Sequence, residues 1–263
     1  MPPVSKRVRT YDSAKTRTAV LAQFTAVRTA VDTLTPEQLA LPTRLGEWTV
    51  RDLSAHLSMV LGMLLRHLDR PAPREAEIAL LDWPFSTADA ATAVDEATRG
   101  LAAEADPGEL FARVAERIGP ELAKTPGDRP VPTRSGPLRL DDFMVTRCVE
   151  LIVHTDDLND ATGLDIPYDR QALAACTRML ADALAVKAPG GAVEVRIPPY
   201  AVVQCVEGPR HTRGTPPNVV ETDPLTWIRL ATGRTGWAEA LDAAKVSASG
   251  ERADLAPLLP ILS

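Results

Sequence analysis

The stretch that decides the fold is LDDFMVTRCVELIVHTDDLNDATG, residues 140–163. It predicts one long helix, because acidic residues stand in its first turn, where they complement the helix dipole, and Gly163 is a typical stop. The helix is apolar nearly everywhere, so it should lie buried among other helices. The exception is a short series of charged side chains, which is unusual inside a buried helix.

These charged side chains share one face of the predicted helix. Glu150 and His154 are four residues apart, a step slightly longer than one helical turn, and Arg147 and Asp157 lie on the same face. A polar stripe inside a buried helix is costly unless its groups pair with one another or bind a metal. The alternative is an ion-paired face exposed to water, which the apolar surroundings disfavour.

A second helix is predicted from GEWTVRDLSAHL, residues 46–57. Thr49 can cap the free N–H groups, and Asp52 three residues later completes a capping box, so the helix should begin after Thr49 and run to about Asp69. His56 stands on this helix among leucines. It is either a core residue whose ring is satisfied locally or a ligand that waits for partners from elsewhere in the chain.

The chain has only four histidines, so the remaining two are easily considered. His67 lies eleven residues after His56, about 16 Å along a straight helix, and cannot share a metal with it. We expect His67 to be an exposed cation at the helix end. His211 stands in a Gly- and Arg-rich loop that could touch a substrate, although an ordinary loop residue is the favoured interpretation.

Two domains are expected from the pattern of elements. Residues 1–165 carry four main helical regions with a long loop, TPGDRPVPTRSGP, before the last of them, which suits a four-helix bundle. Residues 166–263 should form a smaller α+β domain. Its predicted elements are a helix (RQALAACTRMLADALAVK), four strands (AVEVRI, YAVVQCVEG, NVVET, KVSASG), a helix that Asp223 caps (DPLTWIRLATG), and two short helices (GWAEALDAA, ADLAPLL).

Composition narrows the classes of function. The net charge of −6 argues against nucleic acid as the main partner. No apolar stretch approaches the roughly 20 residues of a membrane span, and no signal peptide is visible. The three cysteines show no CxxC spacing, so thiols in a reducing cytoplasm are expected. The partners should be small molecules, with the chain a monomer or a homodimer.

Together, His56 from one helix and Glu150 and His154 from another make a set of two imidazoles and one carboxylate. Three protein ligands with a fourth position open are typical of catalytic zinc sites. Cores of helical bundles build such sites from facing helices. The sequence therefore favours zinc or another divalent transition metal at this position.

Two motifs carry a family resemblance. LGEWTVRDLSAHL and TRCVELIVHTDDLNDATG resemble the metal motifs of the mycothiol-dependent maleylpyruvate isomerase family, whose N-terminal domain is a DinB-like bundle, over residues 13–165. The resemblance implies His56, Glu150 and His154 as zinc ligands. The C-terminal segment resembles the sterol carrier protein type two fold of family members, and its LATGR stretch points to Arg234 as an active-site arginine.

The resemblance implies a zinc-dependent enzyme, an isomerase or thiol S-transferase with mycothiol as thiol cosubstrate. Zinc lowers the pKa of a coordinated thiol, and the thiolate could add to an activated double bond of a small electrophile. A nearby cation would stabilise the developing charge, with Arg147, Arg213, Arg229 and Arg234 as candidates. The alternative is a non-catalytic sterol-carrier-type protein that binds a lipid or acyl ligand and has a structural metal site.

Overall fold

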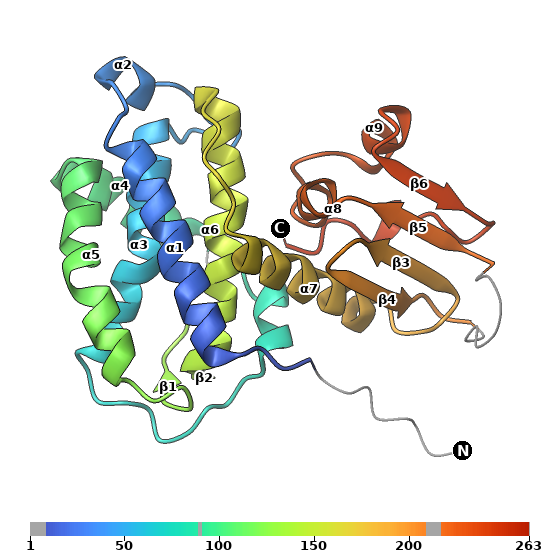
Figure 1. Ribbon diagram of the computed structural model, residues 1–263, viewed down its shortest axis with the longest axis horizontal. Coiled ribbons are helices and arrows are strands. Elements are labelled where there is room, and N and C mark those ends of the chain that lie inside the picture. Colours follow the sequence, from blue (N-terminus) through green and yellow to red (C-terminus); the bar gives the residue numbers. More distant parts are fainter. Residues whose placement is uncertain (1–8, 89–90, 209–216, 263) are drawn as a thin grey trace.

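The computed structural model describes residues 9–88, 91–208 and 217–262. The first part of the chain is helical and the last part combines helices with a small sheet (Figure 1). The elements before residue 165 are α1 (Ser13–Val31), α2 (Pro36–Leu39), α3 (Val50–Leu68), η1 (Leu80–Phe85), α4 (Ala91–Glu104), α5 (Pro107–Lys124), β1 (Pro130–Val131), β2 (Leu138–Arg139) and α6 (Leu140–Thr162).

The two helices that the motifs predict have the expected ends. Thr49 accepts a hydrogen bond from the Asp52 backbone N–H, and the Asp52 carboxylate accepts one from the Thr49 N–H, which completes the capping box of α3. Gly163 adopts a φ of 70° after α6, a conformation that glycine reaches without steric cost. Both predictions are confirmed.

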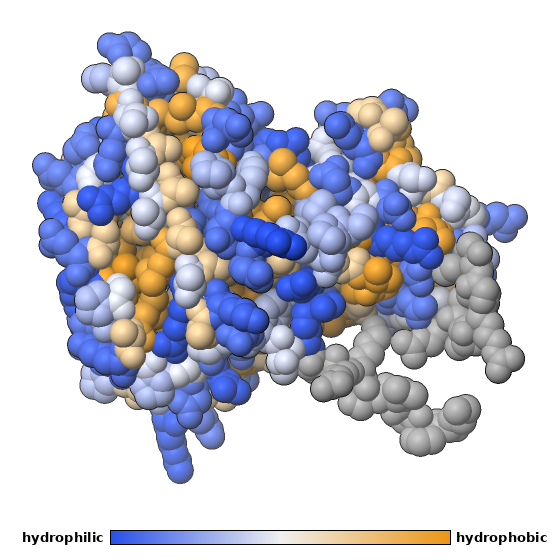
Figure 2. All heavy atoms as spheres, in the orientation of Figure 1, coloured by the Kyte–Doolittle hydropathy of each residue, from blue (hydrophilic) through white to orange (hydrophobic). Residues whose placement is uncertain are grey.

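The bundle packs its helices around α3 and α6. Helix α3 contacts α4, α5 and α6, while α1 contacts α5 and α6. Leucines of α3 at helical spacing (Leu53, Leu57, Leu61 and Leu64) are completely buried. Hydrophilic side chains cover most of the face in Figure 2, and apolar side chains show mainly in patches between them. The core thus fixes α3 beside α6, which matters for the site below.

The segment TPGDRPVPTRSGP, which was expected to be a plain loop, contains half of a short antiparallel ladder. Pro130 pairs with Arg139 and Val131 with Leu138, so strands β1 and β2 form a two-stranded sheet before α6. The ladder is only two residues long on each side, and such short pairs leave almost no alternation in the sequence. It holds residues 132–137 as a turn near the bundle.

The second part of the chain forms a mixed four-stranded sheet in the order β4-β3-β5-β6. Strands β3 and β4 are antiparallel, β3 and β5 parallel, and β5 and β6 antiparallel. The elements are α7 (Arg170–Lys187), β3 (Val193–Ile197), β4 (Ala201–Cys205), β5 (Val219–Thr222), α8 (Pro224–Ala231), α9 (Trp237–Asp242), β6 (Val246–Ser249) and η3 (Ala256–Leu258). The predicted strands and helices are confirmed, with ADLAPLL reduced to one 3-10 turn.

Helix α7 joins the two parts. It contacts α1 and α6 of the bundle on one side and β4 and α8 on the other (Figure 1). Apolar residues of both parts belong to one continuous core. The α+β class is as predicted, whereas the division at residue 165 stays a prediction. None of the described helices combines the length and apolar character needed to cross a membrane.

Candidate metal centre

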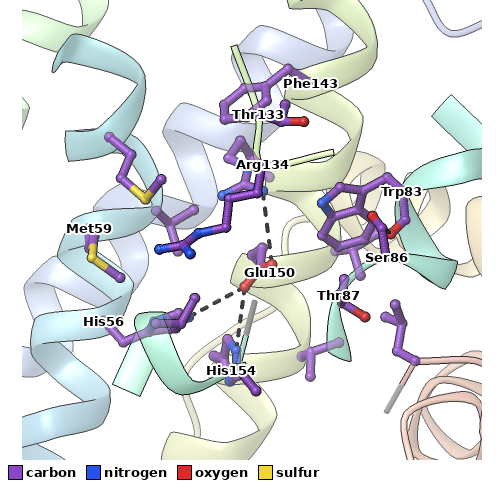
Figure 3. Close-up of a pocket in the computed structure, with 18 of the residues that line it drawn as sticks. His56, Met59, Trp83, Ser86, Thr87, Thr133, Arg134, Phe143, Glu150 and His154 are labelled. Atoms are coloured by element: carbon purple, nitrogen blue, oxygen red, sulfur yellow. Dashed lines mark hydrogen bonds and ion pairs between the residues drawn. The ribbon is translucent and has the colours of Figure 1, made fainter. Parts of the chain in front are cut away.

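Helices α3 and α6 bring two imidazoles and one carboxylate together at the centre of the bundle. Glu150 Oε2 lies 3.4 Å from His56 Nε2 and 3.5 Å from His154 Nε2. The two imidazole rings meet edge to face, with centroids 4.7 Å apart. Figure 3 shows both rings directed at Glu150 from different helices. One donor atom from each residue lies within 4.8 Å of the others.

These distances suit a metal ion. Zinc binds imidazole nitrogen and carboxylate oxygen at about 2.0–2.2 Å, so the edges of its coordination tetrahedron measure about 3.3–3.6 Å. The two distances to Glu150 have this length. A donor set of two imidazoles and a carboxylate also suits zinc. The two distances to Glu150 therefore match zinc coordination, and the helices already hold the three donor atoms within 4.8 Å of one another.

His56 is buried and uncharged at this position. Burial lowers the pKa of its imidazole, and this effect exceeds the opposing one of the Glu150 carboxylate. The Thr98 hydroxyl lies 3.4 Å from Nδ1, and the Trp48 ring packs against the imidazole at a centroid distance of 5.1 Å. These contacts hold the ring in place, and the tautomer that carries its proton on Nδ1 offers the lone pair of Nε2 to an ion.

His154 is oriented by a carboxylate behind it. Its Nδ1 lies 2.8 Å from Asp157 Oδ2, so Nδ1 carries the proton and Nε2 faces Glu150. Burial lowers the pKa of the imidazole, but the hydrogen bonds to Asp157 and Glu150 outweigh burial and raise it. A carboxylate that accepts the far proton of a ligating histidine is the usual second layer of a metal site.

Glu150 is held as a carboxylate. Burial alone would raise its pKa, yet the neighbouring His154, His56 and Arg147 keep that pKa well below its usual range. The Arg147 guanidinium lies 3.9 Å from Glu150 Oε1 and 4.4 Å above the Phe143 ring. Two of its nitrogens also donate to the Thr146 hydroxyl. Arg147 therefore supplies the positive charge closest to the donor set.

A second cluster lies immediately C-terminal to His154 on the same helix. Asp156 and Asp157 are 2% and 0% exposed, and three arginines neutralise them. Arg44 bridges both carboxylates, with Nη2 2.6 Å from Asp156 and Nε 2.6 Å from Asp157. We call Asp156, Asp157, Arg44, Arg229 and Arg234 the arginine–aspartate cluster.

The C-terminal part of the chain enters this cluster through two arginines. Arg229 grips Asp156 with two hydrogen bonds of 2.9 and 2.6 Å. Arg234 donates two hydrogen bonds of 3.2 and 2.9 Å to Asp157. Because Asp157 is also hydrogen-bonded to His154, Arg234 is linked to His154 through that carboxylate. The two bidentate pairs connect the sheet-containing part to α6 and thereby to a ring of the candidate metal centre.

The donor set faces a cavity of about 540 Å³ between α3, α6 and the segments that cover them. His56, Glu150 and His154 lie in its wall, as do Arg147 and Arg234. Figure 3 shows Met59 on the α3 side and Trp83, Ser86 and Thr87 on the opposite side. A volume of this size holds an organic molecule rather than only water.

The predicted site residues have different outcomes. His56, Glu150 and His154 meet as the helical spacing implies, and Arg147 and Arg234 lie in the same cavity wall. Arg229 instead lies on Asp156. Arg213 and His211 fall in residues 209–216, outside the part of the chain that the structure describes.

The prediction for His67 was wrong. Its side chain is half-buried in the cavity wall, and burial lowers the pKa of the imidazole, so it is neutral rather than an exposed cation. Arg44 was missed altogether, because a loop arginine 112 residues from its partner leaves no local pattern. The adjacent acids Asp156 and Asp157 on an apolar helix were the available signal that buried cations exist elsewhere.

The fold and the site together define a helical bundle with a two-histidine, one-glutamate centre, joined to a small α+β unit. Residues 20–159 match the family model of the mycothiol maleylpyruvate isomerase N-terminal domain, and residues 169–261 match that of a bacterial SCP ortholog. The chain therefore belongs to the mycothiol maleylpyruvate isomerase N-terminal domain family.

Solved structures agree with this assignment at the level of fold. A crystal structure of the mycothiol-dependent maleylpyruvate isomerase superposes with a TM-score of 0.53 at 17% identity. A histidine-to-alanine mutant of the same enzyme gives 0.57 at 16%. Each comparison covers 93% of this chain and 95% of the other. No curated protein sequence matches the chain significantly.

Proposed function

We propose that the chain is a zinc-dependent enzyme that uses mycothiol and adds the thiolate to a small electrophile, as an isomerase or a thiol S-transferase. One observation carries the proposal: in a chain of this family, two imidazoles and a carboxylate meet in the wall of a 540 Å³ cavity, with the carboxylate 3.4 and 3.5 Å from the two imidazole nitrogens. Three ligands from the protein leave a coordination position for the thiol.

The proposed ligands are His56 Nε2, His154 Nε2 and one oxygen of Glu150. When bound, zinc would lower the pKa of a coordinated thiol, so that the thiolate is present near neutral pH. The helices hold all three side chains before any ion enters, because α3 and α6 pack directly on each other. Binding therefore costs little reorganisation.

The two proposed arginines differ in what they do. Arg147 is the candidate for stabilising the negative charge that develops when a thiolate adds to an activated double bond, because it lies in the cavity wall beside Glu150. Arg234 makes all its observed hydrogen bonds with Asp157 and the Thr232 carbonyl. It is therefore proposed as a positioning residue, which orients His154 through Asp157.

The lipid-carrier alternative receives less support. Among the described residues of the C-terminal part, the cavity that contains the donor set reaches only Thr232, Arg234 and Leu262. The C-terminal part thus closes one side of the cavity instead of enclosing a long apolar tunnel there. A cytoplasmic location, a monomeric or homodimeric state and a domain division at residue 165 belong to the same proposal.

Metal analysis combined with thiol consumption tests the proposal. We expect about one zinc per chain after reconstitution, and mycothiol consumption in the presence of a small activated alkene that stops when zinc is removed. His56→Ala and His154→Ala should each abolish both readouts. Asp160→Asn, an exposed position on the same helix, serves as the control and should keep the metal. A reconstituted wild-type chain without bound metal would disprove the proposal.

A further inference from the structure

The cavity is much longer than the donor set alone requires. His56, Met59, Met63 and His67 follow one another on α3 at steps of three and four residues, so they share a face, and all four line the cavity. Eleven residues separate the first from the last, which corresponds to about 16 Å of helix. We call the part of the cavity from Met59 to His67 the distal arm.

Apolar side chains form much of the wall of the distal arm. Met59 and Met63 line it from α3, Phe143 from α6 and Trp83 from η1. Figure 3 shows Met59 and Trp83 on opposite sides of the space in front of Glu150. Methionine side chains are flexible and polarisable, and they adapt to apolar and aromatic ligands of varied shape.

Four of the hydroxyl groups around the cavity are already engaged. Ser86 and Thr87 donate to the carbonyls of Trp83 and Pro84 at 2.9 and 3.2 Å. Thr133 and Thr232 donate to backbone carbonyls at 2.6 and 2.7 Å. These hydroxyls therefore use their protons within the protein, and a polar ligand would gain little from them.

Little buried positive charge faces the distal arm. Arg234 is bound to Asp157, and Arg147 lies between Glu150 and the Phe143 ring at the metal end. At the far end, the half-buried His67 is neutral, and its Nδ1 has no hydrogen-bond partner among the described residues. Arg134 also lines the cavity, but its side chain is exposed, so water solvates its charge. A second carboxylate in the distal arm would therefore lose water without gaining a buried cation.

We infer that the electrophile which this site accepts has an apolar body, aryl or alkyl, that occupies the distal arm, and that it is not a small dicarboxylate. This inference rests on the proposed function, because it assigns the substrate class of the same site. The reactive carbon would lie at the donor set beside Arg147, and the apolar body would lie against Met59, Met63 and Phe143. Burial of such a body would supply most of the binding free energy.

A matched pair of unreactive ligands tests the inference. 4-Phenylbutanoate and glutarate share one carboxylate and a three-carbon chain, and differ in carrying a phenyl ring or a second carboxylate at the other end. Each is titrated calorimetrically into the zinc-loaded full chain, without mycothiol. We expect 4-phenylbutanoate to bind about tenfold more tightly or better, with a negative heat-capacity change from apolar burial.

Variants place the preference in the distal arm. Met63→Lys adds a cation there and should lower the ratio of the two affinities about tenfold or more, whereas Met63→Leu should retain it. Val202→Lys adds the same charge on an exposed strand position outside the cavity and should change nothing. Should Met63→Lys lose its helical circular dichroism, Met63→Gln, which is similar in length, should still lower the ratio.

Three results would overturn the inference: glutarate binding as tightly as 4-phenylbutanoate, neither ligand binding, or a preference that the Met63 variants leave unchanged. The proposed function is judged separately, by metal content and mycothiol consumption. A chain that binds zinc and consumes mycothiol yet prefers glutarate would keep its proposed function and lose the assigned substrate class. A chain without bound metal would lose the proposed function whatever the ratio.

Discussion

Two groups of charged side chains lie next to each other on α6, and they differ in how their charges are paired. Around Glu150, the nitrogen atoms of His56 and His154 that face its carboxylate line a cavity. Around Asp156 and Asp157, three arginines saturate both carboxylates. The first group keeps its binding capacity available, whereas the second uses it within the fold. The first group can therefore bind a ligand, whereas the arginine–aspartate cluster connects the C-terminal part to the bundle.

The hydrogen bond between His154 and Asp157 is the link between the two groups. It means that the arginine–aspartate cluster does more than connect the C-terminal part to the bundle. Its geometry also fixes which imidazole nitrogen faces Glu150. The two groups can be separated experimentally, because some substitutions break both and others break only one.

The largest expected effect comes from Asp157→Ala. The change leaves Arg44 and Arg234 without one buried carboxylate and His154 without its orienting partner. We expect the free energy of unfolding to fall by about 3–5 kcal/mol, together with a loss of metal affinity. Urea denaturation measures the first. Glu116→Ala, at an exposed position outside the cluster, should cost less than about 0.5 kcal/mol. An equal cost would show that the arginine–aspartate cluster does not stabilise the fold.

Arg229→Ala should weaken the arginine–aspartate cluster without changing the metal centre. Asp156 would lose two charged hydrogen bonds but keep Arg44 and the Tyr168 hydroxyl. The free energy of unfolding should fall by about 2 kcal/mol, while zinc affinity stays within about threefold of the wild type. A large fall in zinc affinity would show that the two groups are not separable.

Substitution of Arg234, in contrast to that of Arg229, should lower zinc affinity. Arg234→Ala removes the clamp on Asp157, so zinc affinity should fall about 10–100-fold, as for other partners behind a metal ligand. Arg234→Lys should restore only part of it, because an ammonium cannot make the bidentate contact. Competition with a chromophoric chelator measures both, and an unchanged affinity in Arg234→Ala would leave the arginine no positioning role.

Acid sensitivity is the smallest expected effect. Burial raises the pKa of Asp156, but Arg229 and Arg44 outweigh burial and lower it. A carboxyl whose pKa is lower in the folded state stabilises the fold above its unfolded pKa of about 3.9 and loses that contribution as the pH falls further. In Asp156→Asn, the drop in unfolding free energy from about pH 5 to 3 should therefore be about 1 kcal/mol smaller than in the wild type. An equal drop would contradict the cause given.

Local signals in the sequence predicted the parts that depend on local chemistry. The capping box at Thr49 and the glycine after Thr162 set the ends of α3 and α6. The four-residue step from Glu150 to His154 predicted their common face. Residues of the same helix, or a single turn, carry all the information needed for these features.

The remaining features depend on neighbours far away in the chain. His67 was expected in solvent, but the cavity wall covers it. Arg44 reaches across 112 residues to Asp156, and Arg229 reaches across 73. The neighbouring sequence does not predict where these side chains point, because tertiary packing determines their orientation.

The central claim, that Glu150 and the two histidines hold a metal with one position open to a thiol, is tested most directly by X-ray absorption at the zinc edge. The zinc-loaded chain should show a shell of nitrogen and oxygen neighbours at about 2.0–2.1 Å with imidazole scattering. Addition of mycothiol should introduce one sulfur at about 2.3 Å. A shell without imidazole, or one that mycothiol leaves unchanged, would contradict the account.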